Sequence, residues 1–132
     1  MMITTFGELM LRLTATENQR FTQASNFKAN FGGAEANVAV LLSRLGDRTA
    51  FVTKLPNNAL ASAAIAELKG FGIDTSLITR GGNRMGIYFV ETGSDHRGSN
   101  VIYDRIGSSF ATSVFKAVSY THLRAHETLA NL

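Results

Sequence analysis

The sequence predicts an α/β fold, and two features of its pattern lead to that class. Short β-prone segments alternate with two helical segments between residues 2 and 79, in the order strand, helix, strand, helix, strand. This order favours parallel pairing of the strands through right-handed crossovers. After residue 85 the pattern changes to two β-prone runs joined by a polar, glycine-containing segment, which is typical of a β-hairpin.

The first helix is predicted from residues 34–45, directly after Gly32 and Gly33. Apolar side chains recur along it at i, i+3, i+4 and i+7, which is the spacing of one helical face, so we expect these residues to be buried: Val38, Leu41, Leu42 and Leu45. Gly46 follows at the position where a left-handed C-terminal cap is expected.

The start of this helix is a candidate binding element. Gly32 and Gly33 carry no side chains, so a ligand can approach the backbone closely. The N–H groups of a first helical turn are unpaired, and Asn37 adds a donor and an acceptor, which suits a hydroxyl-rich small molecule. The alternative is a glycine turn leading into an ordinary core helix. Neither a Gly-x-Gly-x-x-Gly fingerprint nor a Walker loop is present, so these residues leave the ligand open.

The other elements follow from local pattern. The first strands are expected within residues 2–13, on either side of Gly7, and a further extended piece within residues 21–31. A buried strand is expected at residues 48–54, and a helix at residues 59–69 with an apolar stripe. Three later strands are expected at residues 75–79, 85–91 and 101–106.

Three polar positions stand out beside these elements. Glu8 follows the first strand, where α/β proteins place ligands, although a solvated loop carboxylate is the alternative. Tyr103 and Arg105 are two residues apart on one strand and therefore share a face. An arginine and a tyrosine on one face can hold a carboxylate or sugar hydroxyls, whereas the alternative is a solvated strand face.

Composition narrows the class of partner. The chain has 132 residues, 45% hydrophobic and 17% charged, with no cysteine and a net charge of +3 that is not clustered. The lack of cysteine excludes disulfides and thiolate metal sites, and the lack of a basic, aromatic stripe argues against nucleic acid. Apolar runs are too short to cross a bilayer. We therefore expect a soluble cytoplasmic protein with a small-molecule partner, and no membrane or nucleic-acid partner.

The segment from Phe31 to Ala39, Phe-Gly-Gly-Ala-Glu-Ala-Asn-Val-Ala, carries a family resemblance together with the helix end at Leu45 and Gly46. It resembles the N-terminal signature of the ribokinase-like (phosphofructokinase-B type) carbohydrate kinases. With Gly86-Ile-Tyr88 and Tyr103-Asp-Arg105, the sequence is most similar to the 2-keto-3-deoxygluconate kinases of that family. The resemblance extends from about Met2 to Ser109.

The resemblance implies a doubly wound α/β sheet with a small β-sheet lid, here with lid strands at roughly residues 9–31 and 85–106 of a 1–117 kinase part. In such an enzyme the lid closes over the sugar, and ATP with Mg²⁺ phosphorylates a hydroxyl. Residues that match the family's motifs would contact the sugar acid from the first helix and from the lid, and Arg105 would pair with its carboxylate. These substrate-binding residues are Gly33, Ala34, Asn37, Tyr88, Tyr103 and Arg105. A homodimer through the lid is also implied for the full-length enzyme.

The sequence departs from the family in two places. The family's Gly-Asp-x-x-Gly loop is replaced by Pro-Asn-Asn-Ala-Leu at residues 56–60. The C-terminal Gly-Ala-Gly-Asp motif, which supplies the catalytic base in the family, is absent, as is the ATP-binding half. We therefore expect an N-terminal fragment with no catalytic residue, no cofactor-binding residue and no activity alone. A fructokinase-like enzyme and a non-catalytic sugar-binding or dimerising module are the alternatives.

The last segment, residues 118–132, does not continue the resemblance and is similar to a translated sequencing artefact, so we expect it to be non-native. His122 and His126 are four residues apart, but neither the glutamate of a zinc protease nor a third ligand accompanies them. No metal site is expected.

Overall fold

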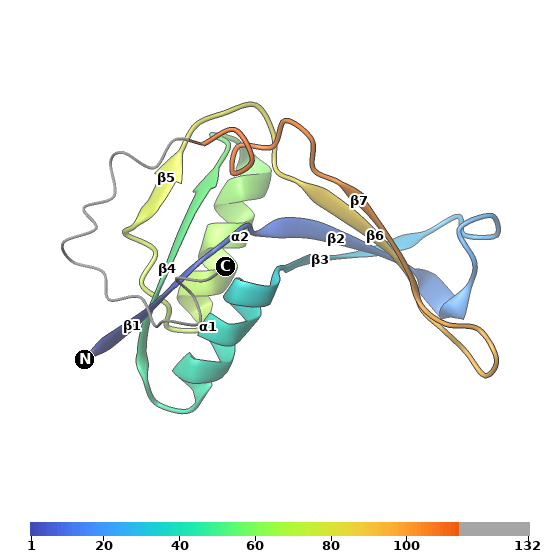
Figure 1. Ribbon diagram of the computed structural model, residues 1–132, viewed down its shortest axis with the longest axis horizontal. Helices are drawn as coiled ribbons and strands as arrows, with labels where there is room; N and C mark the ends of the chain where they lie inside the picture. Colours follow the sequence, from blue (N-terminus) through green and yellow to red (C-terminus); the bar gives the residue numbers. More distant parts are fainter. Residues whose placement is uncertain (114–132) are drawn as a thin grey trace.

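The computed structural model describes residues 1–113, which form two sheets and two α-helices (Figure 1). The parallel sheet has the order β1-β4-β5, and the small sheet has the order β3-β2-β6-β7. In chain order the elements are β1 (Met2–Phe6), β2 (Met10–Ala15), a 3-10 turn (Thr16–Asn18), β3 (Phe27–Gly32), α1 (Ala34–Arg44), β4 (Arg48–Leu55), α2 (Ala59–Gly70), β5 (Ile78–Arg80), β6 (Ile87–Glu91) and β7 (Asn100–Asp104).

The parallel sheet confirms the predicted pairing. β4 lies between β1 and β5 and runs parallel to both, with Ile3 opposite Thr49 and Thr53 opposite Ile78. β4 is buried along most of its length, as its β-prone sequence predicted. β5 begins at Ile78, near the end of the predicted 75–79 segment, and ends at Arg80. Residues 75–77 precede it as a turn in which Asp74 accepts a hydrogen bond from the Ser76 N–H.

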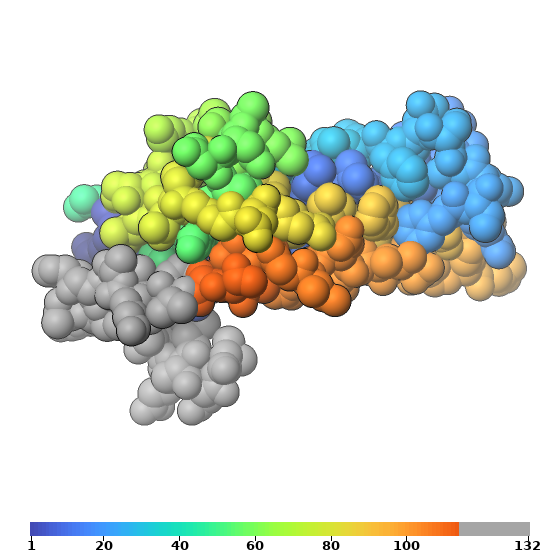
Figure 2. Space-filling model, turned by 90° about the horizontal axis from the view of Figure 1, so that it is seen from above, coloured from blue at the N-terminus to red at the C-terminus, as the bar shows by residue number. Residues whose placement is uncertain are grey.

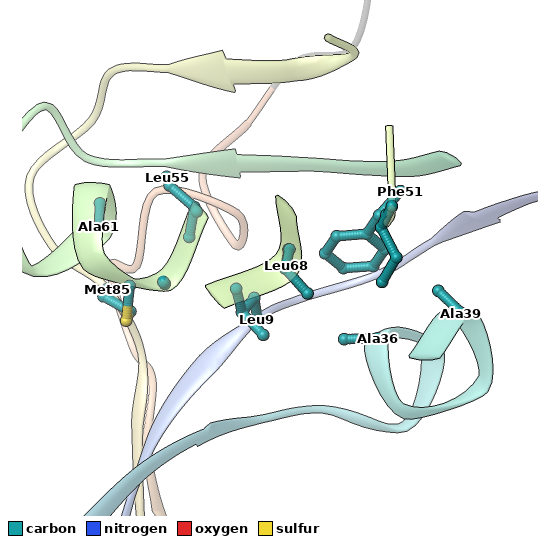
Figure 3. Packing of buried hydrophobic residues seen from close by; sticks show 10 residues of the cluster. Leu9, Ala36, Ala39, Phe51, Leu55, Ala61, Leu68 and Met85 are labelled. Carbon is teal, nitrogen blue, oxygen red and sulfur yellow. The ribbon is translucent and has the colours of Figure 1, made fainter. Parts of the chain in front are cut away.

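Both helices pack against the parallel sheet and form one core with it. Figure 3 shows Phe51 of β4 between Leu68 of α2 and Ala36 of α1, and Leu55 farther along β4 near Ala61 of α2. α2 begins with a side-chain cap, because the Asn58 carboxamide oxygen accepts the Ala61 N–H at 2.9 Å. One face of each helix carries buried alanines, which lets the helices approach the sheet closely: Ala36, Ala39, Ala61 and Ala64.

The predicted buried face of α1 is wrong. Val38, Leu41 and Leu45 are 47%, 57% and 71% exposed, and Leu42 is half-buried, whereas Ala36 and Ala39 are buried. α1 packs against β1 and β4 through the face that carries the buried alanines, so the larger apolar side chains lie on its outer side. The end of the helix is as predicted, with Gly46 at a φ of +96° after the C-cap. The apolar stripe on α1 is therefore uncovered by residues 1–113.

The small sheet extends away from the parallel sheet and the helices (Figure 1). β2 pairs antiparallel with β3 and parallel with β6, and β6 pairs antiparallel with β7 across the predicted hairpin. From above, the segments of this sheet lie alongside one another at one end of the molecule, blue and orange in Figure 2. Three connections join this sheet to the rest of the structure before its last strand: β1 to β2, β3 to α1, and β5 to β6.

The predicted non-native segment, residues 118–132, lies outside the described residues, as do His122 and His126. Within residues 1–113, neither helix has the length and hydropathy needed to span a bilayer.

Candidate sugar-binding site

The start of α1 is open, as a ligand-binding helix start requires. Gly33 is the N-cap residue in an extended conformation, with φ 167° and ψ 149°, and no side chain caps the helix. The first-turn N–H groups therefore have no side-chain acceptor within the described chain. Ala34 and Asn37 are exposed on this turn, whereas the Glu35 carboxylate lies against Gly7. A carboxylate in the first turn disfavours a phosphate there, so the geometry suits a hydroxyl or carbonyl ligand better.

Gly33 and Gly86 are glycines because the chain passes too close to them for a side chain. A Cβ on Gly33 would collide with the carbonyl oxygen of Glu8, and a Cβ on Gly86 would collide with the Glu8 carboxylate. Glu8 thus lies where the β1–β2 connection, the β3–α1 connection and the start of β6 converge. The packing at this junction fixes how the small sheet leaves the parallel sheet.

Glu8 is buried, so its interpretation as a solvated loop carboxylate is wrong. It is 5% exposed, and its Oε1 forms an ion pair of 2.8 Å with Nη2 of Arg105. The Arg105 side chain is 46% exposed. Arg105 lies one residue beyond β7, so the pair connects the last strand of the small sheet to the connection that enters its first strand. A buried carboxylate needs such a partner, because an unpaired charge in this position would be costly.

Tyr88 and Tyr103 lie side by side on the small sheet. They are direct partners in the β6–β7 register, and their rings stack with centroids 5.8 Å apart and an interplanar angle of 27°. The Tyr88 hydroxyl lies against Gly32, where a Cβ would meet it at 2.5 Å. This places the tyrosine face of the small sheet beside the chain that leads into α1.

The register extends this row across all four strands. Arg12 is the partner of Asn30 on β3 and of Tyr88 on β6, so one face carries the row Asn30, Arg12, Tyr88 and Tyr103. The sequence analysis did not identify Arg12 or Asn30. The alternation around Arg12, which stands between Leu11 and Leu13, is the signal that could have found it.

The predicted residues therefore fall into two connected groups. Gly33 and Arg105 are joined through Glu8, and Tyr103 stacks on Tyr88, whose hydroxyl reaches Gly32. Asn37 follows Gly33 on α1, and its N–H donates to the Gly33 carbonyl oxygen at 2.9 Å. It lines a cavity of about 330 Å³ between α1 and α2, which none of the other five predicted residues lines. That cavity is mostly apolar in its lining, so we assign the binding chemistry to the surface between the small sheet and α1.

No cluster of three or more histidine, aspartate or glutamate side chains that could hold a metal ion occurs within the described part of the chain.

Comparison with known proteins agrees with this geometry. The family model described as pfkB family carbohydrate kinase matches residues 1–126. The chain belongs to the pfkB family. This match continues past Ser109, where the resemblance was expected to end, and into the segment beyond residue 113.

Relatives within the pfkB family share both sequence and fold with the chain. It is 38% identical over 111 residues to a 2-dehydro-3-deoxygalactonokinase from Haloferax volcanii, covering 84% of this chain and 35% of that relative. The crystal structure of 2-dehydro-3-deoxygluconokinase from Thermotoga maritima superposes with a TM-score of 0.88 at 47% identity, covering 91% of this chain and 37% of that one. An uncharacterized sugar kinase from Pyrococcus horikoshii in complex with ATP is similar at 25% identity, with a TM-score of 0.77, covering 92% and 39%.

The chain thus spans little more than a third of the pfkB relatives it matches. Its two sheets and two helices correspond to part of a mixed α/β kinase fold, which confirms the predicted fold class.

Proposed function

We propose that residues 1–113 are the sugar-binding part of a carbohydrate kinase that transfers the γ-phosphate of ATP to a sugar acid, with 2-keto-3-deoxygluconate as the expected substrate. One observation carries the proposal. The Tyr88 hydroxyl, whose ring stacks on Tyr103, lies against Gly32, one residue before the uncapped start of α1. We infer that one ligand contacts both the tyrosine side chains and this helix start. The similar proteins include a 2-dehydro-3-deoxygalactonokinase and a 2-dehydro-3-deoxygluconokinase, which supports a keto-deoxy sugar acid as the ligand.

Each predicted residue has a role in this proposal. Gly33 and Ala34 offer backbone N–H groups to sugar oxygens, and Asn37 adds its carboxamide from the same turn. Tyr88 and Tyr103 offer hydroxyl groups from the small sheet, which would act as a lid. Arg105 pairs with the carboxylate of the sugar acid. Its ion pair with Glu8 engages one guanidinium nitrogen, and the remaining N–H donors stay available.

Phosphoryl transfer requires groups that lie elsewhere. A kinase needs a base for the attacked hydroxyl and positive or dipolar groups for the transferring phosphate, and this sequence contains no Gly-Ala-Gly-Asp motif to supply them. ATP and Mg²⁺ would therefore bind to a part of the complete protein outside these residues. We expect the 132-residue chain to bind the sugar acid and to phosphorylate nothing. The complete enzyme is proposed to be cytoplasmic.

The opposite face of the small sheet supports a second part of the proposal, a homodimer of the complete enzyme. The register places an apolar row there, behind the tyrosine row: Ala29, Leu13, Phe89 and Ile102. Ile102 is 49% exposed and the neighbouring Phe27 is 40% exposed. An exposed apolar sheet face of this kind is suited to a second copy of the same chain.

A titration of the purified chain tests the substrate. We expect 2-keto-3-deoxygluconate to shift the backbone amide signals of Gly33 and Ala34 in an NMR spectrum, and fructose to bind more weakly. The variant Arg105→Leu should remove the preference for the acid. Equal binding of both sugars by the unmodified chain would favour a fructokinase-like enzyme. A parallel assay with ATP and Mg²⁺ should show no sugar phosphate, and its formation would refute the inactivity of the chain.

A further inference from the structure

Arg12 lies in the middle of the small sheet and is a cation without a partner among residues 1–113. It occupies the centre of β2, with Asn30 on one side and Tyr88 on the other. Its side chain makes no hydrogen bond and no ion pair with any residue between 1 and 113, and its Nε is buried without an acceptor. A buried guanidinium nitrogen normally has a partner, so an unsatisfied one points to an acceptor that comes from outside the chain.

The charges of the small sheet are segregated between its faces. The face that carries Arg12 also carries Lys28, and no strand residue on it is acidic. The two carboxylates of these strands, Glu91 and Asp104, fall on the opposite face by register. Each is engaged there, because Glu91 accepts the Phe21 N–H at 2.9 Å and Asp104 pairs with Arg84 at 3.0 Å. The tyrosine face is therefore positive.

The net charge of this positive face comes from Arg12 more than from Arg105. The Arg105 guanidinium is 2.8 Å from the Glu8 carboxylate, so the two charges largely cancel for a distant anion. Arg12 has no such compensation among the described residues. An anionic ligand that lies against Tyr88 would thus meet one uncompensated guanidinium, at the neighbouring position of the same row.

We propose that Arg12, flanked by Asn30 and Tyr88, binds the carboxylate of the sugar acid as a second cation in addition to Arg105. This inference rests on the proposed function and adds to it a residue that determines specificity for acids over neutral sugars. The planar guanidinium fork matches a carboxylate in two parallel hydrogen bonds, which a neutral sugar cannot provide. Arg105 holds the junction with Glu8 and contributes its free donors, whereas Arg12 contributes the net charge.

The test compares two variants of the 132-residue chain that each remove one positive charge from the same face. Arg12→Gln removes the proposed carboxylate ligand, and Lys28→Gln removes the other cation, which lies opposite Thr14. The dissociation constants of 2-keto-3-deoxygluconate and fructose are measured for each variant by NMR titration. Amide spectra show whether each variant keeps the fold, and Arg12→Lys serves as a variant that retains the charge and loses the planar fork.

Loss of a charge-assisted contact should weaken acid binding by about 10- to 150-fold in Arg12→Gln, with fructose binding unchanged. Lys28→Gln should change acid binding less than about twofold, as expected for a solvated charge. The dissociation constant of the acid for Arg12→Lys should fall between those for Arg12→Gln and the unmodified chain. If the unmodified chain prefers the acid and Arg12→Gln weakens it no more than Lys28→Gln does, the role of Arg12 is overturned while the proposed function stands. If the unmodified chain does not prefer the acid, both are overturned.

Discussion

Removal of the Arg105 side chain, whose acidic partner is buried, should destabilise the fold more than removal of an arginine whose acidic partner is exposed. Glu8 is only 5% exposed, and Arg105→Leu removes the ion-pair partner of its buried carboxylate. Breaking a buried pair costs about 3–5 kcal/mol when both partners are buried. Because the Arg105 side chain is 46% exposed, we expect a smaller cost, roughly 2–3 kcal/mol in the free energy of unfolding.

Arg84→Leu is the matched control. Arg84 also ties the small sheet to the preceding loop, through an ion pair of 3.0 Å with Asp104, but the two side chains are 34% and 51% exposed. Exposed pairs contribute about 0–1 kcal/mol, so this variant should lose less than about 1 kcal/mol. Urea unfolding followed by circular dichroism measures both variants, since the chain has no tryptophan to report by fluorescence. Equal losses in the two variants would refute the view that Glu8 is a buried charge held by Arg105.

Three further predictions concern the junction, the helix surface and the pH dependence. Gly33→Ala should lower the free energy of unfolding by about 1–3 kcal/mol, because the added Cβ would meet the Glu8 carbonyl oxygen. Gly70→Ala, at a position in α2 with open space around it, should raise the free energy of unfolding by about 0.4–1 kcal/mol. Urea unfolding measures both variants, and unchanged stability in Gly33→Ala would contradict the close approach of Glu8. Leu45→Lys should reduce self-association of the chain without loss of stability, since Leu45 is 71% exposed on the uncovered apolar stripe of α1. Sedimentation velocity measures the association, and an unchanged result would exclude the stripe as the cause of self-association. The backbone N–H of Ser76 lowers the pKa of Asp74 below its ordinary value of 3.8, so ionised Asp74 stabilises the fold above that value and this stabilisation is lost as the pH falls toward the folded-state pKa. Asp74→Asn should therefore lower the free energy of unfolding at pH 7 and make it depend less on pH in the acid range. A pH dependence identical to that of the unmodified chain would contradict this prediction.

Sequence alone predicted the elements whose signals are local. The start of α1 at two glycines, its end at Gly46 and the hairpin around residues 92–99 all depend on residues that are close in sequence, and the structure confirms them. The parallel pairing of β1 and β4 also followed from the order of elements.

The burial of side chains depended on contacts that local patterns do not contain. The periodicity of α1 identified an apolar stripe, but the alanines that touch β1 and β4 form the buried face instead. Glu8 is buried because Gly33, Gly86 and Arg105 converge on it from later parts of the chain. Arg12 acquires its neighbours through strand register, which pairs β2 with two strands far apart in sequence. These neighbours follow from strand pairing, which a local sequence pattern does not contain.

The central proposal is that this chain is the N-terminal, sugar-binding part of a longer kinase. Long-read sequencing of the source DNA through and beyond the codon for Ala117 tests that claim most directly. We expect the reading frame to continue from Ala117 into a second half that contains a Gly-Ala-Gly-Asp helix start, with residues 118–132 replaced by natural sequence. A verified stop codon after Leu132 would contradict the claim and would make the chain a binding module without a kinase reaction of its own.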